Sequence, residues 1–325
     1  MSGRGLGFTG GTVDKLESIP GYRTDLSIEQ MIDNVKKIGI SLIGQTSNLA
    51  PADKKIYALR DATGCVDNMS LIASSIMSKK IASGANKLVL DVTVGSGAFM
   101  KTVEEARQLA NTMKKIGELA NKETICVLTS MEEPLGKYIG NTLEIVEVIE
   151  CLEGKMEPDV KEVVTTIGAY IIKLAKKGDD IEENKKKVLE QIENKNAYRK
   201  FLEVVYEQGG DTSYIDNIYK FKKAEYIIEI KSNKSGYVKR ADARKLGELS
   251  VKLGAGRMKK EDEIDHSAGI MLKKKIGDRV EENETLGYIY TNIESIIEQA
   301  KCEFLDAYEI SEEKIEKQKT IIEII

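Results

Sequence analysis

Two strand-like apolar runs separated by one amphipathic helix constrain the fold of this chain most strongly. The first run, Lys-Leu-Val-Leu-Asp-Val, covers residues 87–92, and the second, Thr-Ile-Cys-Val-Leu, covers residues 124–128. Between them, residues 103–120 carry apolar side chains at helical spacing. A strand, a helix and a second strand in this order typically place two strands side by side in parallel. The pattern predicts an α/β fold with a mixed or parallel sheet flanked by helices.

The spacing of apolar residues changes along the rest of the chain. Helical spacing dominates from Asn141 to about Glu207. Beyond residue 223, short alternating apolar segments are separated by glycines and charged turns, which favours a C-terminal α+β domain rich in strands. We also expect a short buried strand at 40–43, and a charged helix followed by an apolar strand within 310–325.

Composition excludes several classes of protein. The 49 basic and 53 acidic residues nearly balance, so the overall charge favours neither nucleic acid nor an anionic membrane as a partner. The four cysteines are widely spaced, which fits a reducing cytoplasm, and we see no apolar leader or membrane-length apolar run. The single histidine, His266, argues against a Ser-His-Asp hydrolase or a multi-histidine metal site. These features predict a cytoplasmic protein.

The segment from Ser2 to Thr12 is dense in glycine. It reads Ser-Gly-Arg-Gly-Leu-Gly-Phe-Thr-Gly-Gly-Thr, and Thr12 is a plausible N-cap of a following helix. Glycines allow backbone amides to approach a ligand closely, and a helix N-terminus favours phosphate. Composition alone gives a weak signal, because such segments are more often tight turns, and this one matches neither the Walker pattern nor the dinucleotide fingerprint.

The longer string over residues 2–17, Ser-Gly-Arg-Gly-Leu-Gly-x-Thr-Gly-Gly-Thr-x-Asp-Lys-Leu-Glu, resembles the signature of the thymidine and pyrimidine-nucleoside phosphorylases. The resemblance implies a pentosyltransferase of pyrimidine nucleoside salvage and catabolism. Its reaction would be reversible phosphorolysis of uridine, thymidine or deoxyuridine to the free base and (deoxy)ribose 1-phosphate. Ser2 and Thr12 would bind orthophosphate. Further matching stretches lie at 44–55, 57–63 and 74–80.

By the same resemblance, Arg60, Ser75 and Lys79 would contact the pyrimidine base, and Arg60 and Lys79 would be catalytic. Ser75 and Lys79 are four residues apart on one predicted helix and so project from the same face. Cations near the ring oxygens stabilise the negative charge that the departing base acquires. Without the resemblance, solvated helix charges paired with Asp61 or Asp67 would be the commoner arrangement.

The resemblance also implies a domain organisation. Residues 1–51 and 83–223 would form the α/β phosphate-binding domain. Residues 52–82 would be the remnant of a small helical lid that closes over the base. Residues 224–325 would form the C-terminal α+β domain of the pyrimidine-nucleoside phosphorylase type, to which we assign a structural role.

A third matching region implies a cation site. The stretch Leu-Gly-Lys-Tyr-Ile-Gly-Asn over 135–141, with the carboxylate of Glu147, is similar to the potassium site of bacterial members. Leu135, Tyr138 and Glu147 would then bind K+, and no organic cofactor is implied. The alternative is an ordinary helix N-terminus with Glu147 in solvent.

The family's N-terminal helical domain and its Lys-His-Ser-Thr-Gly-Gly loop have no counterpart before Met1. The resemblance therefore implies an N-terminally truncated chain, which is either active, an inactive fragment, or half of a split enzyme whose N-terminal partner supplies the loop. Family members are homodimers. Thr93 replaces the usual lysine, and a thymidine-specific phosphorylase remains an alternative to one that also accepts uridine. An anthranilate phosphoribosyltransferase shares the fold by analogy but lacks the string at 2–17.

Overall fold

The computed structural model describes residues 2–5, 7–8, 10–44, 50–53, 55–56, 68–257 and 262–325. The chain forms two compact units, each of which is described by itself. Unit 1 comprises Met1–Gly44, Glu132–Pro158 and Gln191–Gln318, and unit 2 comprises Gln45–Met131, Asp159–Glu190 and Lys319–Ile325. No helix within the described ranges is long and apolar enough to cross a membrane.

Unit 2 is built on a three-stranded sheet in the order β1-β2-β10. β1 (Lys87–Val94) and β2 (Glu123–Ser130) are parallel and in register from the first residue of each, joined through α5 (Val103–Leu119). β10 (Ile321–Ile324) is antiparallel to β2. The sheet is therefore mixed, and the predicted α/β class with a strand, helix and strand at 87–128 is confirmed.

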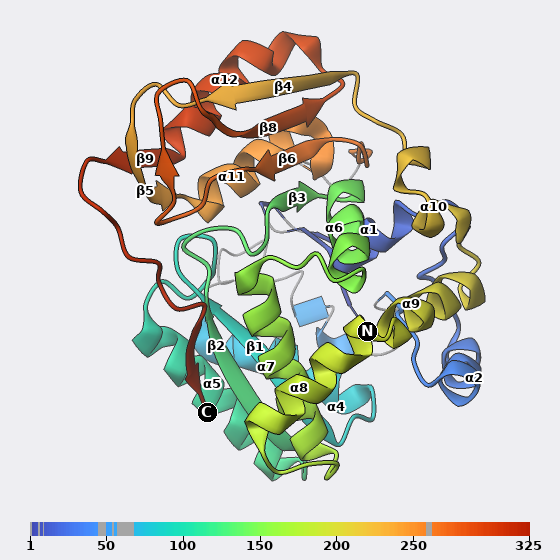
Figure 1. Cartoon of the computed structure of the whole chain (residues 1–325). Coiled ribbons are helices and arrows are strands. Elements are labelled where there is room, and N and C mark those ends of the chain that lie inside the picture. Colours follow the sequence, from blue (N-terminus) through green and yellow to red (C-terminus); the bar gives the residue numbers. More distant parts are fainter. Residues whose placement is uncertain are drawn as a thin grey trace. The chain divides into compact units, whose positions relative to one another are not determined.

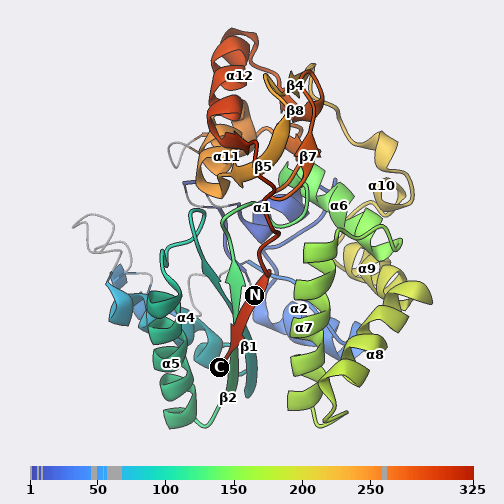
Figure 2. The same cartoon turned by 60° about the vertical axis from the view of Figure 1, so that its left-hand side comes forward.

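Helices cover both faces of this sheet (Figure 2). A capping box starts α5, because the Thr102 hydroxyl accepts from the Glu105 amide at 3.2 Å and the Glu105 carboxylate accepts from the Thr102 amide. Its apolar face packs on the sheet beside α4 (Met69–Ala82), while α7 (Pro158–Leu174) lies on the other face. α8 (Ile181–Glu193) packs on α7.

α4 shares its core with the sheet. The helix is capped by Asn68, whose side chain accepts from the Leu71 amide at 3.1 Å. Ala73 and Met77 are fully buried in the same apolar cluster as the side chains of β1 and α5. The helix predicted to belong to the lid segment is thus anchored on the α/β sheet. The predicted domain boundaries at 51, 82 and 223 stay a prediction.

Unit 1 contains a helical half that carries the glycine-dense segment. Leu16, Ile19, Ile145, Ile149 and Val205 pack at its centre. The helices predicted between 141 and 207 are present, divided between the two units. The elements of this half are α1 (Thr12–Glu17), α2 (Ile28–Ile38), α6 (Thr142–Leu152), α9 (Asn196–Glu207), α10 (Ser213–Asp216) and η1 (Ile218–Lys220).

The strand predicted at 40–43 is wrong. The side chain of Gln208 forms two hydrogen bonds with the backbone of Leu42. It donates to the Leu42 carbonyl at 2.7 Å and accepts from the Leu42 amide at 2.9 Å. A buried glutamine therefore takes the place of a neighbouring strand. What remains is one isolated bridge between Ser2 and Gly44.

The other half of unit 1 is rich in strands, as predicted. One antiparallel sheet has the order β3-β6-β8-β4, and a smaller one has the order β7-β5-β9. α11 and α12 lie along one face of the larger sheet (Figure 1). The elements are β3 (Tyr138–Gly140), β4 (Tyr226–Lys231), β5 (Gly236–Ala241), α11 (Ala243–Ser250), η2 (Val251–Ala255), β6 (Gly269–Leu272), β7 (Arg279–Val280), β8 (Thr285–Thr291), η3 (Glu294–Ile296), α12 (Ile297–Asp306) and β9 (Tyr308–Ser311).

The end of the chain departs from the prediction in one element. The terminal strand is β10, but the charged helix predicted before it is wrong, since residues 312–319 form neither helix nor strand. This stretch reads Glu-Glu-Lys-Ile-Glu-Lys-Gln-Lys and offers one apolar side chain, Ile315, which packs on the C-terminal core. Without an apolar stripe, a short helix gains too little from packing to form.

Candidate functional site

The glycine-dense segment folds back on itself. The Val13 amide donates to the Gly3 carbonyl at 3.4 Å, and the Gly5 amide donates to the Asp14 carboxylate at 2.7 Å. A Cβ placed on Gly11 would lie 2.0 Å from the Gly5 nitrogen, so only glycine at position 11 allows the two ends of the loop to approach this closely. Gly11 is therefore a structural requirement of the turn.

Gly11→Ala should disrupt this loop, because the added methyl group would collide with the backbone of Arg4 and Gly5. We expect at least about a tenfold loss of phosphate affinity, measured by isothermal titration calorimetry. Gly10→Ala is the matched control, since a Cβ there would meet the flexible end of Lys15 at 3.2 Å. Equal phosphate affinity of the Gly11→Ala and wild-type proteins would contradict the prediction.

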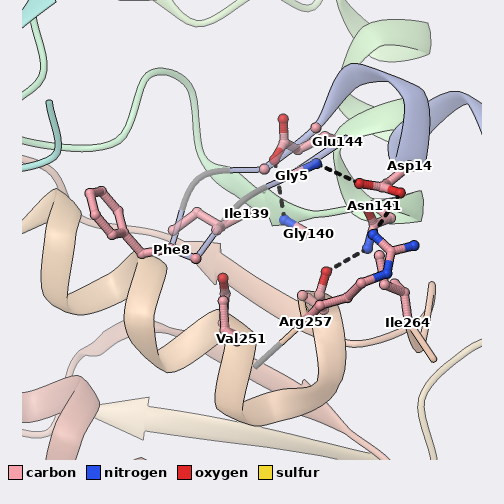
Figure 3. Close-up of a pocket in the computed structure, with 16 residues that line it drawn as sticks. Gly5, Phe8, Asp14, Ile139, Gly140, Asn141, Glu144, Val251, Arg257 and Ile264 are labelled. Carbon is pink, nitrogen blue, oxygen red and sulfur yellow. Dashed lines mark hydrogen bonds and ion pairs between the residues drawn. The ribbon is translucent and has the colours of Figure 1, made fainter. Parts of the chain in front are cut away.

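The buried carboxylate of Asp14 accepts hydrogen bonds from several parts of the loop. Asp14 is 2% exposed and accepts from the Arg257 guanidinium at 3.1 Å and from the Gly5 amide (Figure 3). It also accepts from the Arg4 guanidinium at 2.9 Å. Arg4 also forms a two-point pair with Glu17, at 2.6 and 2.9 Å, and the hydrogen bond to Glu17 raises the pKa of Arg4. Arg4 is therefore held by two carboxylates of α1, an arrangement that the sequence reasoning missed.

The two residues predicted to bind phosphate stand at opposite ends of the loop. Ser2 is half-buried, and its amide donates to the Ile43 carbonyl at 2.9 Å. Thr12 is exposed and is the first residue of α1, so the predicted N-cap is off by one, because the extended backbone of Gly11 occupies that position. Their binding of phosphate stays a prediction.

A small hollow of about 40 Å³, room for a few water molecules, borders the loop. The loop glycines form one side of it, and the corner between β3 and α6 forms another. Residues 255–257, at the end of η2 and just beyond it, form a third (Figure 3). Opposite the loop, Glu144 forms an ion pair with Lys15 and accepts from the Gly140 amide at 3.3 Å. Lining residues are Gly5, Gly10, Gly11, Gly140, Asn141 and Arg257.

The predicted base-contacting residues lie in unit 2. Ser75 and Lys79 project from one face of α4, and the Lys79 ammonium donates to the Ser75 hydroxyl at 2.9 Å. The ammonium also pairs with Asp53 at 2.9 Å. Ser75 is 6% exposed, so this polar pair is set into the protein surface. Arg60 lies outside the described residues, as do Asp61 and Asp67, its partners in the alternative arrangement. Contact of Arg60, Ser75 and Lys79 with the base stays a prediction.

The predicted cation residues converge on one turn in unit 1. The Glu147 carboxylate, on α6, accepts from the backbone amides of Lys137 at 2.8 Å and Tyr138 at 3.4 Å. Burial raises its pKa to about 7. Glu147 is half-buried and bonded to this turn. On the turn itself, Lys275 donates to the carbonyls of Pro134 at 2.8 Å and Gly136 at 3.0 Å.

This donor set fits a monovalent cation better than a transition metal. The half-buried Glu147 carboxylate offers oxygen ligands and a negative charge that partial burial makes costly, and the Pro134 and Gly136 carbonyls of the turn already accept from the Lys275 ammonium. No group of three or more His, Cys, Asp or Glu side chains in the described part of the chain could hold a metal. Binding of potassium by Leu135, Tyr138 and Glu147 stays a prediction.

Two family models match this sequence. Residues 1–198 match the model described as glycosyl transferase family, a/b domain. Residues 237–311 match the model described as pyrimidine nucleoside phosphorylase C-terminal domain. The first model covers the loop, Ser75, Lys79 and Glu147, and the second covers Arg257.

Individual relatives match most of the chain. The pyrimidine-nucleoside phosphorylase of Bacillus subtilis strain 168 is 48% identical over 298 residues, which is 92% of this chain and 69% of the relative. A protein of the same name from Staphylococcus haemolyticus strain JCSC1435 is 49% identical over 296 residues, 91% of this chain and 68% of the relative. The one from Staphylococcus aureus strain N315 is 47% identical over the same length and the same shares.

Proposed function

The chain belongs to the pyrimidine-nucleoside phosphorylase family, and from this membership we propose that it is a pentosyltransferase acting on uridine, thymidine and deoxyuridine. It would catalyse their reversible phosphorolysis to the free base and (deoxy)ribose 1-phosphate in pyrimidine salvage and catabolism. The observation that carries the proposal is the identity of nearly half of all residues over 92% of the chain.

The proposed reaction uses two sets of residues, those assigned to phosphate and those assigned to the base. Orthophosphate bound at the loop through Ser2 and Thr12 attacks C1′ of the sugar opposite the base. The bond between C1′ and the ring nitrogen breaks through a transition state with oxocarbenium character, and its electron pair stays on the pyrimidine. Arg60 and Lys79 stabilise that negative charge, and Ser75 orients the ring.

The finer parts of the proposal are a potassium ion, a homodimer and a cytoplasmic location. The half-buried Glu147 carboxylate beside the 134–138 turn supports the ion, which would fix this turn electrostatically. The resemblance supports the dimer, or alternatively a complex with a separate N-terminal half. The widely spaced cysteines support the cytoplasm.

A direct assay tests the proposal. We expect uracil and thymine to be released from uridine, thymidine and deoxyuridine in phosphate buffer but not in sulfate buffer of equal ionic strength. A second arm adds the family's N-terminal helical domain as a separate polypeptide. Release only in the second arm indicates a split enzyme, and release from thymidine and deoxyuridine alone indicates the narrower specificity. No release in either arm, from folded protein, contradicts the proposal.

A further inference from the structure

The segment that follows η2 reaches the glycine-dense loop. Arg257 donates to Asp14 at 3.1 Å, and the opposite oxygen of Asp14 accepts from the Gly5 amide at 2.7 Å. We propose that Arg257 is a positioning residue, which fixes Asp14 and through it the loop in the conformation that binds phosphate. The C-terminal domain would then set phosphate affinity and not act as a structural appendage. This inference rests on the proposed function.

Burial strengthens the hydrogen bond between Arg257 and Asp14. Asp14 is 2% exposed and the Arg257 side chain 24% exposed, so water competes weakly for the charged hydrogen bond. Arg4 shares the same Asp14 oxygen but is 52% exposed and is held bidentately by Glu17. If Arg257 is removed, the more solvated Arg4 is the one remaining charged partner of Asp14 among the hydrogen bonds described above. The Asp14 carboxylate can then shift toward Arg4, and the Gly5 amide that is bonded to it moves as well.

A second contact from the same domain reaches the loop independently. Gly247 of α11 lies under Phe8, where an added Cβ would be 2.8 Å from the Phe8 carbonyl oxygen. The Arg244 guanidinium stands over the Phe8 ring at 5.4 Å. The domain therefore touches the loop both near Gly5 and at Phe8.

Further hydrogen bonds keep the Arg257 segment in place. The Asn141 side chain, 2% exposed, donates to the Ala255 carbonyl at 2.8 Å, and the Thr142 amide donates to the His266 carbonyl at 3.1 Å. Both donors stand at the start of α6. Arg257 is thus presented to Asp14 from a fixed backbone, as a positioning role requires.

Arg257→Met should loosen the loop, because it removes the charged partner that fixes Asp14. In the phosphorolysis assay we expect the KM for phosphate to rise about tenfold, with kcat and the KM for uridine within about twofold of wild type. Hydrogen exchange should show the amides of residues 2–5 and 10–14 exchanging about tenfold faster. Gly247→Ala, acting from the Phe8 side, should shift both readouts in the same direction. Arg279→Met is the matched control, because its guanidinium is exposed and pairs with Glu281.

Two results would overturn the proposal. One is a fall in kcat with an unchanged phosphate KM, which is what a merely destabilised protein with fewer active molecules would show. The other is unchanged exchange of the loop amides in Arg257→Met. If the wild-type protein shows no turnover at all, that contradicts the proposed function, and the exchange rates of wild type and Arg257→Met still decide whether Arg257 orders the loop.

Discussion

Lys79→Met should lower kcat/KM for phosphorolysis by about 100- to 1,000-fold, mostly through kcat. The Lys79 ammonium is held by Ser75 and Asp53, each at 2.9 Å, so its position on α4 is fixed by two contacts. Negative charge develops on the ring only as the glycosidic bond breaks. An ammonium directed at that charge therefore stabilises the transition state more than the bound nucleoside.

Lys80→Met is the matched control, because it removes the same charge from the next position of α4. Lys80 is five residues after Ser75 and so lies on a different face of the helix, and burial lowers its pKa. We expect its kcat/KM to stay within about threefold of wild type once differences in stability are accounted for by circular dichroism. Ser75→Ala should fall between the two lysine variants. Equal losses in Lys79→Met and Lys80→Met would mean that α4 contributes only overall charge or stability.

The sequence predicts those parts of the fold that depend on local pattern. The apolar runs at 87–92 and 124–128 and the helix between them give the parallel pair β1 and β2, because each element buries a face with its own period. The spacing of Ser75 and Lys79 places them together for the same reason, since residues four apart share a helix face.

Contacts between distant residues escape such reasoning. The Leu42 segment looks apolar enough for a strand, yet the side chain of Gln208, 166 residues away, binds its backbone. The Asp14 site is a similar case, because its second guanidinium comes from Arg257, 243 residues away. A single sequence holds no local signal for either pair, although Asp14 lies inside the quoted signature string.

Glu147→Gln should make the protein more stable than wild type at about pH 8 in the absence of potassium, by up to about 3 kcal/mol. Burial raises the pKa of Glu147 to about 7 in the folded protein, from an ordinary value of 4.5. Between these two values the unfolded chain has lost the proton and the folded protein keeps it. The contribution of this group to stability is therefore fully present below about pH 4.5, falls as the pH rises, and levels off above about pH 7. Glutamine remains neutral throughout, so the variant lacks this decline.

Potassium should reverse that difference. A cation bound by the ionised Glu147 carboxylate stabilises the folded protein by mass action, about 1.4 kcal/mol when its concentration is ten times its dissociation constant. Thermal unfolding at about pH 8 should therefore occur at a higher temperature in KCl than in choline chloride for wild type. The Glu147→Gln variant should unfold at the same temperature in both salts.

Glu153→Gln is the matched control, because this carboxylate at the end of α6 is exposed and pairs with Lys155. It should keep both the decline in stability with pH and the response to potassium. At about pH 5 the potassium response should vanish in every protein, since protons then occupy Glu147. A potassium response that persists in Glu147→Gln would place the cation elsewhere. If Glu147→Gln loses the decline in stability with pH but wild type shows no response to potassium, Glu147 is a carboxylate with a raised pKa that binds no ion.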